Sequence, residues 1–104
     1  MASRHRRVVW SQEARRELDE AVEHIAGQAP TAAAHFVERL LETAASLSTL
    51  GKRGRVVPER SDPSIRELLV DPYRLVYLVG SDQVVILGLI HQRRSFEGWR
   101  DPDS

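Results

Sequence analysis

The stretch IRELLVDPYRLVYLVGSDQVVILGLIH, residues 65–91, decides the fold. It contains three runs rich in β-branched and aromatic residues, separated by the short turn sequences Asp71-Pro72 and Gly80-Ser81-Asp82. Runs of this composition between turn residues are typical of β-strands, and connections this short join strands that lie antiparallel. The stretch therefore predicts an antiparallel meander of three strands, at residues 65–70, 73–79 and 83–91.

The residues before this stretch have the period of helices. Ser11 can cap a first helix, whose apolar residues recur at helical spacing up to Gly27, a plausible stop. Thr31 is the predicted N-cap of a second amphipathic helix, which runs to about residue 49. The short β-branched and aromatic run at residues 6–10 predicts a first strand that precedes both helices.

The predicted element order is β-α-α-β-β-β. It indicates an α+β fold in which a helical hairpin packs on a mainly antiparallel four-stranded sheet. Residues 50–64 are rich in glycine and arginine and contain two prolines, so we expect a loop there. A chain of 104 residues is long enough for one core. We therefore expect a single domain over residues 1–100 and a frayed tail at residues 101–104.

Composition narrows the class of protein. The chain has no cysteine, which excludes disulfides and thiolate metal sites and favours a reducing compartment. Its longest apolar run, residues 84–90, is far shorter than the roughly 20 residues that span a bilayer. His5, His24 and His35 lack the spacing of metal ligands. We expect a soluble cytoplasmic protein with no metal, no cofactor and no membrane partner.

The charge is balanced overall but unevenly distributed. Fifteen basic and fifteen acidic residues give a net charge of zero. Residues 11–50 carry seven acidic and three basic residues, a net charge of −4, and the rest of the chain carries a net charge of +4. The zero sum argues against an indiscriminate nucleic-acid binder, whereas the uneven distribution can steer a partner.

Strand alternation predicts which side chains share a face of the sheet. If the two turns are tight, Leu69 lies opposite Arg74, and Arg74 lies opposite Leu89. Arg74 and His91 then share one face, which Arg93 joins if the strand continues. The apolar members of that face have no element of this chain left to cover them. A broad uncovered apolar surface rimmed by charge predicts a protein partner.

Three segments together resemble the RelE/ParE superfamily of toxins from type II toxin–antitoxin systems. They are GRVVPE at residues 54–59, IRELLVDPYRLVYLV at residues 65–79 and VVILGLIHQRR at residues 84–94. The resemblance implies a small α/β toxin that is neutralised by an antitoxin, ParD-like in the ParE branch, whose C-terminal segment wraps around it. RelE-like members cut mRNA in the ribosomal A site without a metal, whereas ParE-like members poison DNA gyrase.

The resemblance to the nuclease branch rests on a few residues. It implies that Arg74 contacts the scissile phosphate and that Glu59 lies where some nucleases place a general base. His91 can titrate near neutrality, and Arg93 or Arg94 can hold phosphate. However, the 50–64 segment has only one lysine, no tyrosine follows Tyr77, and the pI is about 6.9. These departures favour a ParE-like toxin that acts on DNA gyrase.

Several alternatives stay open at this stage. Arg74 can form a structural ion pair with Glu67, and Trp99 can anchor the C-terminal segment or contact a partner. The basic 50–64 loop is expected to be solvated unless it contacts the target. The function can also be that of a ribosome-dependent mRNA endonuclease or a non-toxic binding domain of the same fold. The predicted target- or partner-binding residues are Arg74, His91, Arg93, Arg94, Leu69, Val76, Leu78, Leu87, Leu89 and Trp99.

Overall fold

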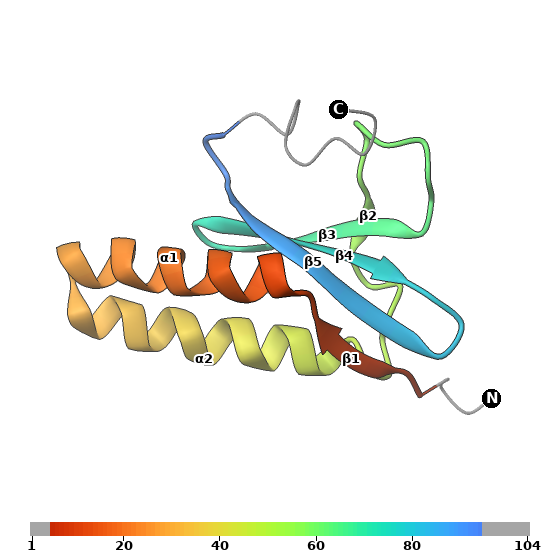
Figure 1. The fold of residues 1–104 in the computed structure, drawn as a ribbon, viewed down its shortest axis with the longest axis horizontal. Helices are drawn as coiled ribbons and strands as arrows, with labels where there is room; N and C mark the ends of the chain where they lie inside the picture. Colours follow the sequence, from red (N-terminus) through yellow and green to blue (C-terminus); the bar gives the residue numbers. More distant parts are fainter. Residues whose placement is uncertain (1–4, 95–104) are drawn as a thin grey trace.

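The protein has two layers, a helical hairpin and a five-stranded sheet (Figure 1). The computed structural model describes residues 5–94. Both helices lie on one face of the sheet, which confirms the predicted α+β class. Within the described residues, neither helix has the length and apolar character needed to cross a membrane.

The two helices are α1 (Gln12–Gln28) and α2 (Pro30–Ser46), joined through Ala29 alone. The Ser11 side chain accepts a hydrogen bond from the Ala14 N–H at 3.0 Å, so the predicted cap of α1 is confirmed. The prediction of Thr31 as the cap of α2 is wrong. Pro30 occupies the first turn, where its missing N–H costs nothing, and Ala29 is the N-cap.

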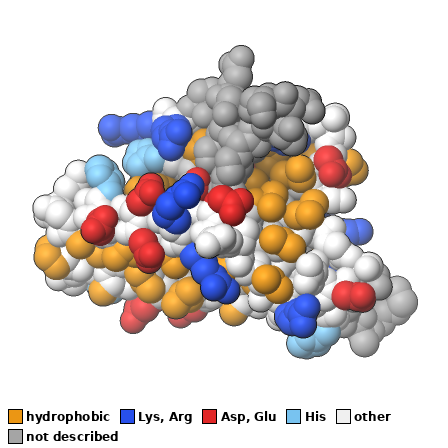
Figure 2. Space-filling model, in the orientation of Figure 1, with side chains coloured by type: hydrophobic (Ala, Val, Ile, Leu, Met, Phe, Trp, Pro, Cys, Tyr) orange, Lys and Arg blue, Asp and Glu red, His pale blue; other side chains and the backbone are white. Residues whose placement is uncertain are grey.

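The predicted acidic half of the chain coincides with this hairpin. Figure 2 shows acidic side chains spread over the helices. The described basic residues outside the hairpin lie in or next to β1, in the 50–66 segment, in β4 and after β5.

The sheet has the strand order β1-β5-β4-β3-β2. The expected strands are present as β1 (Arg7–Trp10), β3 (Ile65–Val70), β4 (Tyr73–Val79) and β5 (Gln83–His91). β1 runs parallel to β5, and the other pairs are antiparallel. The prediction of four strands is corrected to five, because β2 (Arg55–Val56) forms within the segment expected to be a loop. Two paired residues are too few to produce a strand period.

A β-bulge in the middle of β5 changes the predicted register of the second half of the strand. Val79 lies opposite Val84 as predicted, but the pairing shifts by one residue at the Val76/Tyr77 step of β4, and Leu87 is left without an opposite residue. Arg74 therefore pairs with Ile90 and not with Leu89. The shift turns Leu89 and His91 toward the helices, so the prediction that His91 shares a face with Arg74 is wrong.

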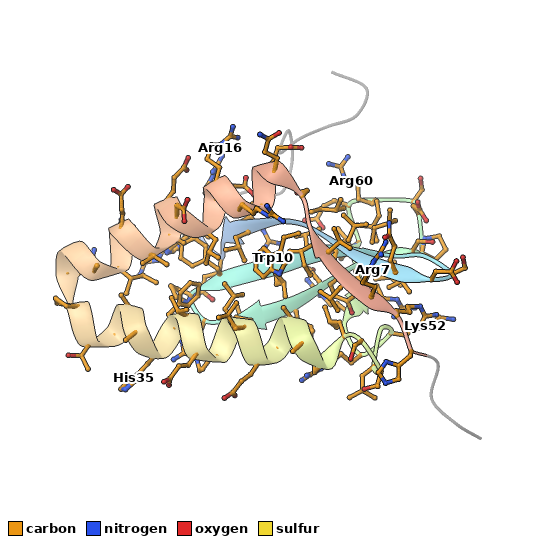
Figure 3. The ribbon with its side chains drawn as sticks, turned by 60° about the horizontal axis from the view of Figure 1, so that its bottom comes forward. Arg7, Trp10, Arg16, His35, Lys52 and Arg60 are labelled. Atoms are coloured by element: carbon orange, nitrogen blue, oxygen red, sulfur yellow. The ribbon has the colours of Figure 1, made fainter. Side chains whose placement is uncertain are left out.

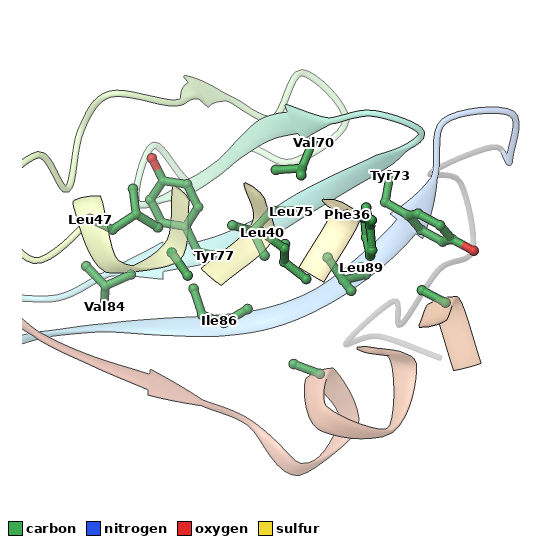
Figure 4. Packing of buried hydrophobic residues seen from close by; sticks show 13 residues of the cluster. Phe36, Leu40, Leu47, Val70, Tyr73, Leu75, Tyr77, Val84, Ile86 and Leu89 are labelled. Carbon is green, nitrogen blue, oxygen red and sulfur yellow. The ribbon is translucent and has the colours of Figure 1, made fainter. Parts of the chain in front are cut away.

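The main core lies between the sheet and the helices (Figure 4). Phe36 and Leu40 of α2 belong to the same cluster as Tyr77 and Ile86 of the sheet, and all four are almost fully buried. Removal of such side chains from water supplies the main stabilising free energy of the fold. The other buried members of this cluster are Ala14, Ala21, Ala44, Leu47, Val70, Tyr73, Leu75, Val84 and Leu89.

The opposite face of the sheet has a smaller apolar cluster. Val57, Val76 and Ile90 are fully buried there, and Ile65 and Leu87 pack against them. The prediction of a broad uncovered apolar face is therefore wrong for the middle of the sheet, because Val57 from the end of β2 packs onto it. Leu69, with 60% of its surface exposed, remains open to a partner.

Candidate functional site

A buried carboxylate between two arginines is the centre of the face opposite the helices. Glu67 of β3 is only 3% exposed. Its Oε2 atom lies 2.6 Å from Nη2 of Arg55 and accepts a hydrogen bond from Arg55 Nε at 2.7 Å. Its Oε1 atom lies 3.4 Å from Nη1 of Arg74. We call Arg55, Glu67 and Arg74 the charged cluster.

Three neighbouring strands position this cluster. Arg55 of β2 lies directly opposite Glu67 of β3, and Arg74 of β4 lies diagonally from Glu67, opposite Leu69. Cross-strand neighbours at these positions are close enough for long side chains to meet. The predicted ion pair between Arg74 and Glu67 is therefore confirmed. Arg55 was missed as its second partner, because β2 itself was not predicted.

The cluster also connects the sheet to the segment after β5. Arg74 Nη2 donates a hydrogen bond to the carbonyl of Arg94 at 3.1 Å, and Gln92 Nε2 donates to Asp71 Oδ1 at 3.2 Å. Arg74 thus contacts a carboxylate and a carbonyl at once. Among the described residues, the cluster places two guanidinium groups around one carboxylate.

A pocket of about 460 Å³ lies beside the charged cluster. The cluster supplies its polar wall, and Leu68, Leu69 and Gln92 complete the described lining. The exposed Leu69 side chain offers apolar contact area next to positive charge. A segment with one apolar side chain and a nearby carboxylate has the chemistry to bind there.

His91 lies in a second pocket, on the helix side of the sheet. This pocket has a volume of about 510 Å³ and contains His24, Tyr73 and His91. The His91 ring is edge-on to Tyr73 at 5.1 Å and to His24 at 6.3 Å between ring centroids. The pKa of Tyr73 is raised, mainly by burial and secondly by the charge of Glu20. The remaining described lining is Glu17, Glu20, Ala21, Leu89, Arg93 and Arg94.

The helix residues of this pocket were missed by the sequence prediction, although a signal was present. Glu17, Glu20 and His24 are spaced by three and four residues, which puts them on one side of α1. Glu17 also has a structural role, because its Oε1 atom accepts a hydrogen bond from the Leu89 N–H at 3.1 Å. That contact satisfies a backbone group of β5 beyond the last residue paired with β1.

The other predicted site residues are scattered. Glu59 is exposed in the turn after Val57, and Arg93 and Arg94 are exposed after β5. Val76 and Leu89 are buried and offer almost no surface to a partner. Leu78 and Leu87 are half-buried, and Trp99 lies outside the described residues. Across residues 5–94, the structure has no group of three or more His, Asp or Glu side chains arranged to hold a metal.

Known proteins share both the sequence pattern and the fold. A family model for the ParE toxin of the type II toxin–antitoxin system parDE matches residues 8–96. The chromosomal ParDE toxin–antitoxin system from P. aeruginosa is structurally similar, with a TM-score of 0.69 and 21% identity over 84% of this chain and 96% of that chain. No curated protein sequence matches significantly.

Two further solved structures have the same fold. The RelBE2 toxin–antitoxin complex from Mycobacterium tuberculosis has a TM-score of 0.56 and 24% identity, over 85% of this chain and 92% of that chain. The YoeB dimer from Staphylococcus aureus has a TM-score of 0.54 and 16% identity, over 81% of this chain and 93% of that chain.

The helical hairpin on a mixed sheet and these matches define the class as toxin components of type II toxin–antitoxin systems. Because the family model covers most of the sequence, the chain belongs to the ParE toxin family. The resemblance drawn from the sequence is thereby confirmed.

Proposed function

We propose that this toxin acts by binding DNA gyrase and that a ParD-like antitoxin neutralises it. The observation that supports the proposal most is the separation of the nuclease candidates. Arg74 lies on the face opposite the helices, where it contacts the carboxylate of Glu67. His91 lies on the helix side against Tyr73. A ribonuclease needs its acid, base and phosphate-binding groups around one scissile bond.

The contacts of each nuclease candidate also favour a structural role. Arg74 donates hydrogen bonds to Glu67 and to the Arg94 carbonyl, so its guanidinium links β4 to β3 and to the segment after β5. The His91 Nδ1 atom accepts a hydrogen bond from the Arg93 N–H at 3.1 Å, which orders the turn after β5. Both residues therefore have structural partners, and a protein-binding toxin needs no further chemistry from them.

The antitoxin is proposed to bind beside the charged cluster. Its pocket combines the exposed Leu69 with the guanidinium groups of Arg55 and Arg74. A C-terminal antitoxin segment with an apolar side chain and an acidic residue would match both features. The ParDE and RelBE2 systems among the structural neighbours support a partner of this kind.

Purified toxin and DNA gyrase provide the test. We expect the toxin to inhibit supercoiling of relaxed plasmid or to trap cleaved DNA, and we expect added antitoxin to reverse the effect. Substitution of Arg93 and Arg94 by glutamate should weaken inhibition at least tenfold, because both are exposed at the end of β5. Arg15 and Arg16, exposed on α1, provide the matched double glutamate control, which should keep full activity.

A parallel assay on translating ribosomes separates the alternatives. The proposal expects intact mRNA in that assay. It is overturned if wild-type toxin leaves gyrase unaffected at large molar excess, or if it cleaves mRNA and Arg74→Ala abolishes the cleavage. A toxin inactive in both assays that also leaves growth unaffected would instead be a non-toxic binding domain.

A further inference from the structure

A third pocket, formed by cationic side chains, lies at the end of the sheet near the β4–β5 turn. It has a volume of about 280 Å³, and its charged lining residues are Arg6, Lys52 and Arg66. The described lining contains no carboxylate, and is completed by Pro63, Ser64, Val79 and Gly80. We call this site the basic pocket. Neither the gyrase proposal nor the antitoxin proposal uses it.

Arg6 is held in this pocket by backbone contacts. Its Nε atom donates to the Gly80 carbonyl at 2.8 Å, and its backbone N–H donates to the Ser48 carbonyl at 2.7 Å. The side chain passes close over Gly51, where a Cβ atom would lie 3.0 Å from Arg6 Nη1. The absence of a side chain at Gly51 therefore leaves room for the guanidinium beside the loop.

Arg66 fixes the same loop from the other side. Its Nη1 atom donates to the carbonyls of Gly54 at 2.8 Å and Lys52 at 3.2 Å. The Gly54 N–H donates to the buried Tyr77 hydroxyl at 2.9 Å, and a Cβ on Gly54 would lie 2.6 Å from the Glu67 carbonyl oxygen. The loop thus has a defined conformation, and Lys52 extends from it at the rim.

These contacts leave the positive charge available. Arg6 and Arg66 donate to carbonyls, which orient a guanidinium without cancelling its charge. A guanidinium has five N–H donors, so the hydrogen bonds described use a minority of them. Asp62, which precedes the lining residue Pro63, accepts a hydrogen bond from the Ser64 N–H through Oδ1 at 2.9 Å.

More cations extend the basic pocket along this end of the molecule. Figure 3 shows Arg7 and Lys52 at the same end of the sheet, whereas Arg16 lies on α1. Arg53 is exposed next to Lys52. The helices do not cover this end, because α2 stops at Ser46. A chain of zero net charge therefore gathers several cationic side chains at this end of the sheet, beside the acidic Asp82 of the β4–β5 turn.

We infer that the basic pocket binds a phosphate group of double-stranded DNA. Pre-oriented guanidinium groups and a lysine at the rim match the shape and charge of a phosphate oxyanion. The described lining has no aromatic ring on which an unpaired base can stack, so a duplex backbone fits better than a single strand. The choice of DNA rests on the proposed gyrase target, since gyrase holds duplex DNA.

The test uses the full-length toxin without gyrase and a fluorescein-labelled duplex of about 20 base pairs, with anisotropy measured over a range of salt concentrations. Lys52→Gln changes only an exposed side chain. It should weaken binding several-fold and lower the slope of log affinity against log salt by about one, the effect expected for one lost phosphate contact. Arg16→Gln is the matched control, since it removes one exposed positive charge on α1, and it should leave both quantities unchanged.

Three outcomes would overturn the inference: no duplex binding at low salt, an equal loss of affinity in the two variants, or tighter binding of single-stranded RNA than of duplex DNA. Circular dichroism and a thermal melt establish that Lys52→Gln is folded. The gyrase assay gives a separate answer. If wild-type toxin fails to inhibit supercoiling but Lys52→Gln still loses duplex affinity, the proposed target is wrong and the basic pocket stands.

Discussion

The two faces of the sheet are built from the same strands, yet they have different chemistry. On the face under the helices, seven buried apolar residues of the sheet join six from the helical hairpin and its C-cap in one cluster. The opposite face has three buried apolar residues and the charged cluster around Glu67. Because side chains alternate along a strand, each face can be specified separately. The first face mainly stabilises the fold, and the second leaves Arg55 and Leu69 exposed to solvent.

The faces also differ in how they are closed. Two amphipathic helices cover the first face, and their apolar residues interdigitate with those of the sheet (Figure 4). The second face receives Val57 from the end of the two-residue strand β2. A smaller cluster with fewer fixed neighbours can relax more easily around a lost side chain. The comparison can therefore be tested by equal substitutions on the two sides.

The largest expected effect comes from replacing one buried isoleucine on each face of the sheet. Ile86 and Ile90 are both fully buried in β5 but belong to different clusters. Ile86→Ala should lower the free energy of unfolding by about 4 kcal/mol, and Ile90→Ala by about 2 kcal/mol, because the second site can collapse more completely. Urea denaturation of the two variants measures the difference. Equal losses would show that the two faces contribute alike to stability.

The charged cluster gives the next largest effect. Glu67→Gln keeps the shape of the side chain but removes the charge that faces Arg55 and Arg74. We expect the free energy of unfolding to fall by about 2 kcal/mol. This loss is smaller than for a fully buried ion pair, because the Arg55 side chain is 67% exposed.

Glu20→Gln is the control for this change. Its carboxylate pairs with Arg16 on the surface, and both side chains are about two-thirds exposed. A surface pair of this kind should contribute less than about 0.5 kcal/mol. Urea denaturation would contradict the assignment of a structural role to Glu67 if the two amide variants were equally stable.

The smallest expected effect is a loss of stability at alkaline pH, caused by Tyr77 on the helix-covered face. Burial raises the pKa of Tyr77 above its ordinary value of 10.0, although the Gly54 hydrogen bond and then Arg66 and Arg53 act in the lowering direction. A raised pKa in the folded state gives stability that is complete below pH 10 and is lost as pH rises through the folded-state pKa.

Tyr77→Phe should therefore flatten the fall in stability above pH 10. At neutral pH it should cost about 1 kcal/mol, because the Gly54 N–H loses its acceptor. Thermal melts between pH 7 and pH 11 measure both effects. Tyr73→Phe is the comparison, since the pKa of Tyr73 is also raised by burial. An unchanged alkaline profile in both variants would contradict the assignment.

Most of the fold could be predicted because its signals are local. The strand runs, the Ser11 cap and the two amphipathic helices each follow from residues close in sequence. Two features could not be predicted for the same reason. β2 is too short to have a period. Gly88 in β5 is compatible with a bulge, but the position of the shift depends on how β4 and β5 pair, which neither strand fixes by itself.

The candidate site was predicted less completely, because it depends on that register. The ion pair of Arg74 with Glu67 followed from a turn whose pairing was correct. The placement of His91 beside Arg74 failed, because the one-residue shift lies between the turn and His91. The basic pocket is formed by Arg6, Lys52 and Arg66, which come from three segments of the chain. Their spacing along the sequence therefore could not predict the pocket.

The bulge in β5 also has an evolutionary consequence. Residues before Leu87 and residues after it follow opposite inside–outside frames, although they belong to one strand. The difference between the frames is a single residue, the length of one codon. Loss of Leu87 would remove the bulge and restore regular pairing, and Leu89, Ile90 and His91 would keep their present faces and partners. A one-residue insertion or deletion at this step can therefore be absorbed as the gain or loss of a bulge, with the histidine kept on the helix side.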